Sequence, residues 1–290
     1  SISVYFTNEK IDFNFECEEL KFENSYYQQL SKGLIITNMR DYALWGVYIS
    51  NFVFFVAISL VGSLVTAILR LTGAHWSTPL TRIAEVIAVA AIIMAGLTII
   101  IDMGRPDRIY NIFLHGRLQS PIIWDVLVIS TYLSISLMLL FFPLLPDFAI
   151  LKDYFKDKPK LSKWYGKLSL NWTGNKTQVK LYDKSIQILS VLIIPVAFGI
   201  HTVTAWLFAT TYRPGWDSSN FGPYFIAGAF VAGAGAVVVV MYVLRRVYHL
   251  ENYITDMHFD KMGKLLVLLC LIYLYFNVNE YRSEERRVGK

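Results

Sequence analysis

Six long apolar stretches dominate this 290-residue sequence. They cover residues 45–71, 78–104, 122–145, 186–212, 222–244 and 264–281. A helix needs about 20 mostly apolar residues to cross the hydrocarbon core of a bilayer. Because no water satisfies backbone polar groups inside a bilayer, a helix is the form that such a stretch takes. The sequence therefore predicts an all-α fold, a polytopic transmembrane helical bundle with six spans.

Composition supports this prediction and excludes other classes. Hydrophobic residues make up 55% of the chain and charged residues 17%, against about 25% charged in a typical soluble domain. The alternative of a soluble helical bundle is therefore disfavoured. Cys17 and Cys270 are the two cysteines, which is too few for an iron–sulfur cluster held by this chain alone. The chain lacks a Walker A motif and a GxGxxG fingerprint, so we expect neither ATP nor a nicotinamide. We also expect no resident metal and no nucleic acid as a partner.

Both ends of the chain differ from its centre. The chain begins at Ser1, and residues 1–27 are polar and aromatic. We therefore expect the N-terminal segment, residues 1–44, to be partly altered and to lie on the outward side. Residues 45–281 form the expected bundle. The last nine residues, 282–290, read RSEERRVGK. This string is the translation of a common sequencing-adapter sequence, so we expect it to be an artefact and the natural chain to continue beyond Tyr281.

Basic residues indicate how the bundle is oriented. The stretch 146–185 contains nine lysines, and Arg245, Arg246 and Lys261 follow the fifth span. These loops should lie on the same side of the membrane, and the positive-inside rule makes that side cytoplasmic. The loop at 104–108 and the loop at 213–217 should then face outward, together with residues 1–44.

Ionisable residues inside apolar spans are candidates for function because they are costly to bury. Asp102, Asp125 and His201 fall at a similar depth, in the outward half of the second, third and fourth spans. Helical spacing puts Asp125, Tyr132 and Ser136 on one face. Arg105 lies one turn after Asp102 and could pair with it. The structural alternative is that these groups only cap helices or bond to neighbouring helices.

Other residues suggest structural roles. Glu85 lies near the inward end of the second span, three residues after Arg82, so we expect an ion pair between them; a role in a proton route is the alternative. Gly228, Ala232 and Ala236 have the spacing of a close helix contact. His201 is the histidine expected within a span, with His75, His115, His249 and His258 in loops, so we expect no haem held between two histidines of this chain.

Four strings resemble the polysulfide reductase, NrfD-like membrane subunit family. They are IIIDMGRPDRIYNIFLHGRLQSPIIWD at 99–125, HTVTAWLFATTYRPGW at 201–216, GPYFIAGA at 222–229 and HLENYIT at 249–255. The resemblance covers about residues 28–281. The chain departs from the family pattern at Leu60 and Asp217, where many relatives carry histidine.

The resemblance implies a subunit of a quinone-linked respiratory complex in a bacterial or archaeal cell (inner) membrane. Such subunits lack haem, are not catalytic alone, and exchange electrons with a peripheral iron–sulfur (ferredoxin-like) subunit, often beside a molybdopterin or multihaem cytochrome subunit. The resemblance maps the quinone (menaquinone) site of the family onto Asp102, Asp125 and His201. We expect Asp125 and His201 to contact the quinone, Asp102 to accept protons, and Arg105 and Tyr132 to support the site. Two alternatives stay open: a quinone-free structural or proton-conducting subunit, and a secondary transporter.

Overall fold

The computed structural model describes residues 2–6, 9–13, 22–33, 46–73, 78–103, 106–210 and 220–288. Its first part is a two-stranded antiparallel hairpin of β1 (Ile2–Phe6) and β2 (Glu9–Phe13). A short helix, α1 (Phe22–Lys32), follows. At 11 residues α1 is too short to cross a bilayer. The described part of the N-terminal segment therefore adds local structure and no span.

Within the described residues, six long helices form the bundle, as the hydropathy pattern predicts. They are α2 (Val47–Leu71), α3 (Thr78–Asp102), α5 (Pro121–Tyr154), α7 (Lys176–Ala209), α8 (Phe221–Val247) and α9 (Asp256–Val288). All six are long and apolar enough to span a membrane. Helices α5 and α7 extend well past the apolar stretches that predicted them, because polar residues continue the helix beyond the bilayer.

Three shorter elements connect the spans. A single 3-10 turn, η3 (Pro106–Arg108), and a short helix, α4 (Tyr110–Leu114), lie between α3 and α5. Helix α6 (Pro159–Leu168) lies between α5 and α7. Proline occupies the first turn of both α5 and α6, where a missing backbone N–H costs nothing.

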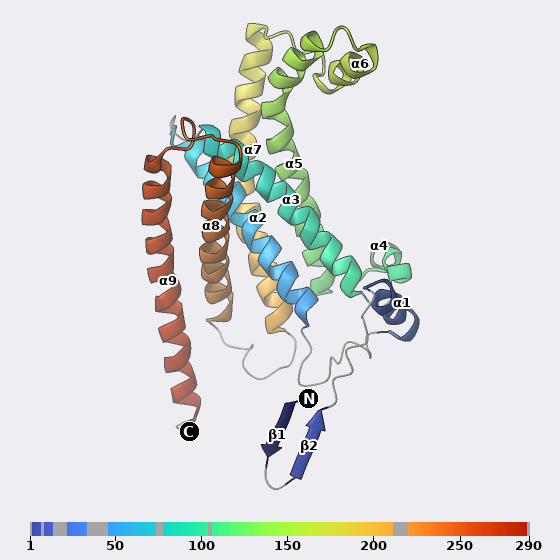
Figure 1. Cartoon of the computed structure of the whole chain (residues 1–290), viewed down its shortest axis with the longest axis vertical. Coiled ribbons are helices and arrows are strands. Elements are labelled where there is room, and N and C mark those ends of the chain that lie inside the picture. The colour runs from blue at the N-terminus through green and yellow to red at the C-terminus, as the bar shows by residue number, and fades with distance from the viewer. Residues whose placement is uncertain are drawn as a thin grey trace.

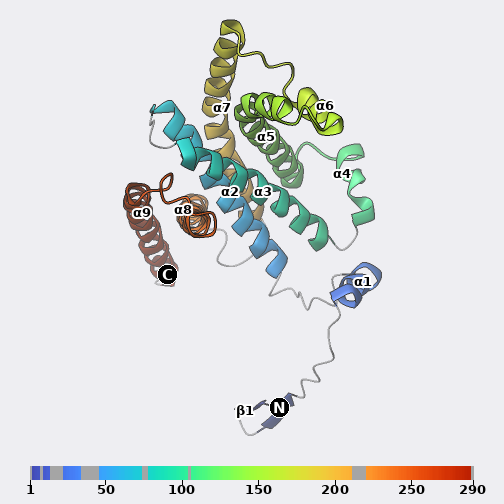
Figure 2. The same ribbon diagram turned by 45° about the horizontal axis from the view of Figure 1, so that its top comes forward.

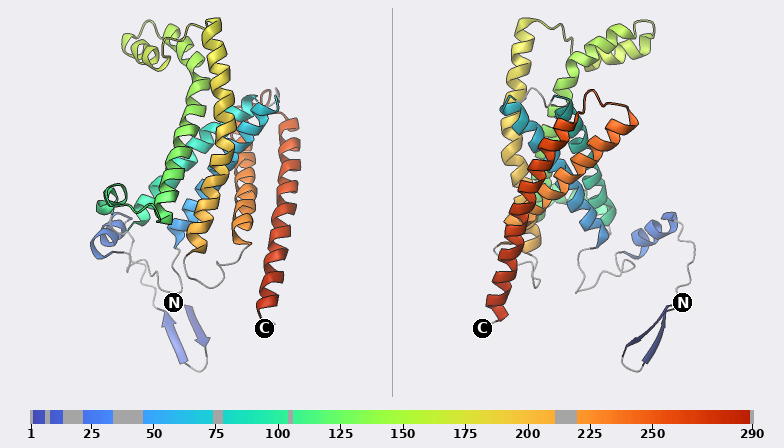
Figure 3. Two further views of the ribbon diagram at one scale, coloured as in Figure 1. Left: turned by 180° about the vertical axis from the view of Figure 1, so that it is seen from behind. Right: turned by 60° about the vertical axis from the view of Figure 1, so that its left-hand side comes forward.

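The basic loops lie together at one end of the bundle. Helix α6, the start of α7 and the α8–α9 connection lie in the upper part of Figure 1, whereas α4 and the start of α8 lie lower in the same view. The rear view in Figure 3 shows the same separation. We call the end that carries α6, the start of α7 and the α8–α9 connection the basic end, and the other end of the bundle the opposite end. The shared side of the lysine-rich stretch and the α8–α9 connection agrees with the sequence prediction. Which side of the membrane this is stays a prediction.

Helix α2 lies at the centre of the bundle. It packs against α3, α7 and α8, and Figure 2 shows α8 and α9 on one side of it and α5 with α6 on the other. A Cβ atom added at Gly62 of α2 would lie 2.6 Å from the Ala84 carbonyl oxygen of α3. Added at Gly233 of α8, it would lie 2.5 Å from the Ala57 carbonyl oxygen of α2. These two glycines let the backbones approach closely.

The prediction that Gly228, Ala232 and Ala236 together form the close-packing face of α8 was wrong. Ala232 is exposed, and the close contact with α2 is made by Gly233. Gly228 faces α9 instead, because an added Cβ there would lie 3.2 Å from the Tyr273 ring. Spacing alone identified a helix rich in small residues but did not identify which of them touch the central helix.

Two ion pairs connect α3 to other helices near the basic end, and they correct the expected pairing. Glu85 of α3 is 3% exposed, and its Oε1 lies 2.7 Å from Nη2 of Arg70 on α2. Arg82 instead reaches Asp147 of α5, with 2.7 Å between Nη1 and Oδ2. The predicted pair of Glu85 with Arg82 was therefore wrong. In the packed bundle, Glu85 and Arg82 each pair with a side chain on another helix and do not pair with each other, although they are i,i+3 neighbours.

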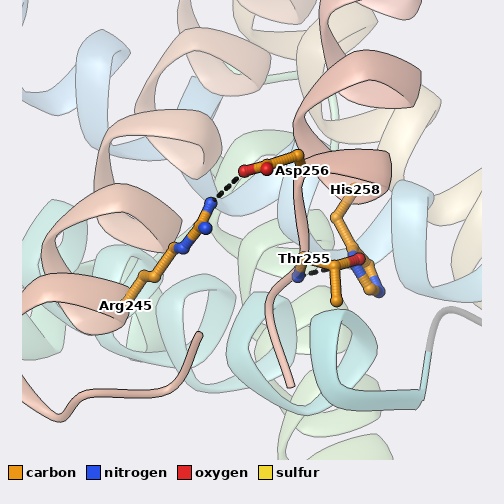
Figure 4. A network of polar contacts seen from close by, with 4 residues as sticks. All are labelled: Arg245, Thr255, Asp256 and His258. Carbon is orange, nitrogen blue, oxygen red and sulfur yellow. Dashed lines mark hydrogen bonds and ion pairs between the residues drawn. The ribbon is translucent and has the colours of Figure 1, made fainter. Parts of the chain in front are cut away.

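The connection between α8 and α9 is held by a small polar network, drawn in Figure 4. Arg245 Nη1 donates to Asp256 Oδ1 at 2.6 Å. His258 Nδ1 accepts the Thr255 backbone N–H at 3.1 Å, which caps the start of α9. His258 is thus a buried residue in the first turn of α9, and the expectation that it lies in a loop was wrong. His258 lies at the basic end, whereas His201 lies in the opposite half of the bundle. The two imidazoles are therefore too far apart to bind one haem between them.

Candidate functional site

The candidate site lies in the half of the bundle away from the basic end. Asp125 follows the first turn of α5, and His201 precedes the end of α7 by eight residues. With a rise of about 1.5 Å per residue, both lie within about 12 Å of their helix ends along the axis. Asp102 is the last residue of α3. The structure therefore places all three predicted residues in the same half of the bundle.

Asp125 and His201 come together through Thr204. Asp125 is 5% exposed and His201 1% exposed. The Thr204 hydroxyl donates to Oδ1 of Asp125 at 2.7 Å, which joins α5 to α7. Thr204 follows His201 by three residues, so both side chains lie on one face of α7. The sequence analysis missed Thr204, although its spacing from His201 is a signal that could have identified it.

An aromatic cluster on α8 borders His201. The His201 and Phe225 ring centroids are 6.0 Å apart. Phe225 also lies beside Phe208 of α7 and Phe221 of its own helix, at 6.0 and 5.8 Å. Phe225 gives the buried imidazole an apolar neighbour, and Phe208 and Phe221 extend that apolar surface behind Phe225. A planar, hydrophobic ligand suits such a surface.

His201 Nδ1 is buried and makes no hydrogen bond of regular geometry with the described residues. The backbone of Ala197, one turn earlier on α7, also interacts with the imidazole. Oδ1 of Asp102 is likewise buried and lacks a hydrogen-bond partner in the described part of the chain. Buried polar atoms are nearly always paired in native proteins, and exceptions often mark ligand sites. The predicted pair of Asp102 with Arg105 lies outside the described residues.

Tyr132 belongs to a different set of contacts, deeper in the bundle. Its hydroxyl donates to the Ser59 carbonyl oxygen at 2.7 Å and lies 2.8 Å from the Ser63 hydroxyl. Ser59 in turn donates to the Ala88 carbonyl oxygen of α3 at 2.7 Å. This network ties α5, α2 and α3 together. The shared face of Asp125, Tyr132 and Ser136 is confirmed, since all three are buried; the quinone contact of Tyr132 stays a prediction.

The site combines an acid, a base and an apolar wall. A carboxylate at Asp125 can accept a proton from a hydroxyl, and the imidazole of His201 can accept or donate one. Both groups lie away from water, where hydrogen bonds to a ligand are stronger than in solution. Groups of three or more possible metal ligands do not occur among the described residues. The arrangement can bind an uncharged ring that carries oxygen atoms and can exchange protons with it.

Fold and site together define a class of protein: a multi-pass membrane helical bundle with buried acid–base groups in one half of the bilayer. Comparison with known families identifies it further. The polysulphide reductase NrfD family matches residues 36–286. The chain belongs to this family, and the resemblance seen in the sequence is confirmed.

Two relatives illustrate the family. The chain is 31% identical over 261 residues to a Halobacterium salinarum protein that is named as a membrane subunit of dimethyl sulfoxide reductase. It is 24% identical over 225 residues to a selenate reductase subunit of Mesobacillus selenatarsenatis. These matches cover 89% and 75% of this chain, but 55% and 52% of the relatives. The chain thus spans about half the length of the curated relatives it matches.

Proposed function

We propose that this chain is the membrane subunit of a respiratory reductase complex and that it binds a quinone, such as menaquinone, beside Asp125 and His201. The contact between Asp125 and Thr204, with His201 one turn away, carries this proposal. The similarity to proteins named as subunits of dimethyl sulfoxide and selenate reductases supports it. In this role the chain is not catalytic alone.

The chemistry of a quinone suits these residues. Interconversion of quinol and quinone moves two protons and two electrons, so the site needs a proton acceptor near each ring oxygen. Asp125 and His201 supply two such groups on adjacent helices. The unpaired Nδ1 of His201 can hydrogen-bond a ring oxygen, and Phe225 provides an apolar surface for the ring. Asp102, at the end of α3, would pass protons to or from the aqueous phase, with Arg105 and Tyr132 supporting the site.

The electrons require a partner protein. The chain has two cysteines, which is too few to hold an iron–sulfur cluster by itself. We infer that a peripheral iron–sulfur subunit, alone or with a molybdopterin or multihaem subunit, docks at the end of the bundle nearest Asp102 and Asp125. There η3 and α4 form the described surface between α3 and α5. A short distance between quinone and cluster would then allow electron transfer.

The proposal is tested by replacing the two acid–base groups in the assembled complex. Asp125→Asn keeps the shape of the side chain but removes the proton acceptor, and His201→Phe fills the same space with an apolar ring. We expect each change to lower quinone-linked turnover by roughly 10²–10⁴-fold, as loss of a positioned acid or base does. The measurement is quinol oxidation or quinone reduction by membranes that contain the complex.

Two neighbouring residues provide matched controls. Thr131 and Thr202 donate to carbonyl groups of their own helices and belong to α5 and α7. Thr131→Val and Thr202→Val should keep near-normal turnover at an equal level of assembled complex. If Asp125→Asn and His201→Phe also keep normal turnover, the quinone site is elsewhere. If, in addition, the purified complex holds no quinone at this chain, a quinone-free structural subunit replaces our proposal.

A further inference from the structure

Helix α6 has two distinct surfaces that the proposed function does not use. Leu161, Trp164, Tyr165 and Leu168 recur at the helical spacing of one apolar face. Lysines occupy the remaining surface at positions 160, 163 and 167. An amphipathic helix rich in lysine, with tryptophan and leucine on its other face, is typical of segments that lie at a membrane surface.

One residue of the apolar face fixes α6 to α5. The ring of Tyr165 lies between those of Phe148 and Phe155, at centroid distances of 6.2 and 5.7 Å, and is stacked with both. Ser162 adds a hydrogen bond from its hydroxyl to the Lys152 carbonyl oxygen at 3.1 Å. Helix α6 is therefore held against the last two turns of α5.

The point of attachment is at the boundary of the membrane. Phe148 immediately follows Asp147, whose ion pair with Arg82 is partly exposed, at 36% and 52% of the two side chains. Charged pairs of this kind do not face hydrocarbon. The part of α5 beyond Asp147 thus lies in the headgroup region or just above it, and α6 packs alongside this part.

A shallow, open hollow lined by lysines lies between α6 and the end of α5. Its volume is about 680 Å³, and its basic lining residues are Lys152, Lys156, Lys163 and Lys167. Ser162 and Asn171 add neutral hydrogen-bonding groups. None of the residues that line it is acidic. Asp153 lies nearby, 3.4 Å from Lys156, but both side chains of this pair are about 70% exposed and water screens them. The hollow is therefore positive and suits an anion.

The rest of the apolar face of α6 remains exposed. Trp164 is 68% exposed, and Leu161 and Leu168 are 41% and 37% exposed. Tyr165 is excluded from this stripe because it packs on α5. The exposed stripe lies next to the lysine-rich surface, and its tryptophan is a residue enriched where membrane proteins meet the lipid headgroups. A partner that is both anionic and apolar would satisfy the two surfaces together.

We propose that the hollow binds the phosphate group of an anionic phospholipid in the adjacent leaflet, while Trp164 and its leucine neighbours lie among the lipid headgroups and upper acyl chains. A lipid fits better than an acidic protein, because the lysines and the exposed stripe lie together on one helix that packs beside the last two turns of α5, next to the charged pair taken as the membrane boundary. Basic pockets beside spans are known to attract anionic headgroups. The proposal is independent of the quinone site, which lies in the opposite half of the bilayer.

The test compares two pairs of lysines in the purified full chain. Lys163→Gln with Lys167→Gln removes two charges from the hollow. Lys176→Gln with Lys180→Gln removes two charges from the exposed start of α7, outside the hollow. Each protein is placed in nanodiscs that mix phosphatidylcholine with phosphatidylglycerol, and retained lipid is measured by native mass spectrometry. At about 1 kcal/mol for each lysine, the first pair should weaken retention of phosphatidylglycerol about thirty-fold, whereas the second pair should change it less than about three-fold.

A second measurement separates a lipid from other occupants. Brominated phosphatidylglycerol should quench the fluorescence of the chain, and Trp164→Phe should remove a distinct part of that quenching, whereas brominated phosphatidylcholine should quench this part less. Equal losses from both lysine pairs would mean diffuse attraction and would overturn the proposal. Displacement by millimolar inorganic phosphate would mean a simple anion site and would also overturn it. Unchanged lipid retention by the Lys163→Gln, Lys167→Gln protein would also overturn the proposal.

Discussion

Replacing Glu85 by leucine should destabilise the bundle strongly, because it removes one member of a buried ion pair. Glu85 is 3% exposed and lies 2.7 Å from Arg70. Loss of one partner of a buried pair costs roughly 3–5 kcal/mol, since the remaining charge is left uncompensated. Arg70 keeps 19% of its side chain exposed, so water can partly solvate it. We therefore expect a cost at the lower limit, about 3 kcal/mol.

Arg82 and Asp147 provide the matched comparison from the same end of α3. Their distance is also 2.7 Å, but the two side chains are 52% and 36% exposed. Exposed pairs contribute less than about 1 kcal/mol, so Asp147→Asn should cost correspondingly little. Equal distances with unequal costs would show that burial, not separation, sets the contribution of each pair.

Unfolding of the purified chain in mixed micelles, titrated with sodium dodecyl sulfate and followed by tryptophan fluorescence, measures both costs. The double variant Arg70→Met with Glu85→Leu should recover most of the loss, because no charge is then left without a partner. The reasoning is refuted if Asp147→Asn costs as much as Glu85→Leu. It is also refuted if the double variant is less stable than Glu85→Leu alone.

Three further predictions follow from the fold. In a cysteine-free background, a cysteine that replaces Lys163 should not react with an impermeant thiol reagent in intact cells. A cysteine that replaces Leu114 should react. The reverse result would mean that the predicted topology is inverted. Gly233→Ala should lower the free energy of unfolding by about 1–3 kcal/mol, because the added methyl group overpacks against α2. Gly235→Ala is the control: its added Cβ meets no atom within 4 Å, so it should be neutral or stabilising. Equal effects of the two substitutions would contradict the close contact at Gly233. Tyr132→Phe removes the hydroxyl that bonds to Ser59 and Ser63 and should lower the free energy of unfolding by about 1–2 kcal/mol. It should reduce turnover less than Asp125→Asn does. An equal loss of turnover would make Tyr132 a direct quinone contact.

The sequence by itself determined the class of fold. Each span was predicted from its own residues, because the free energy of transfer into a bilayer is local and nearly additive along a helix. The same holds for the shared side of the basic loops, which depends on charge counts and on the number of spans. The buried face of Asp125, Tyr132 and Ser136 was also predictable, since it requires only helical periodicity within one element.

Tertiary structure alone decided which side chains meet. Glu85 has a basic neighbour three residues away, yet it pairs with Arg70 on another helix. Gly233, not its neighbours at the predicted spacing, contacts α2, and Thr204 joins Asp125 to the helix of His201. Each of these contacts depends on how two helices are rotated and shifted relative to one another. Hydropathy is nearly uniform around a span that faces both lipid and protein, so the sequence of one helix does not set its rotation; packing against its neighbours does.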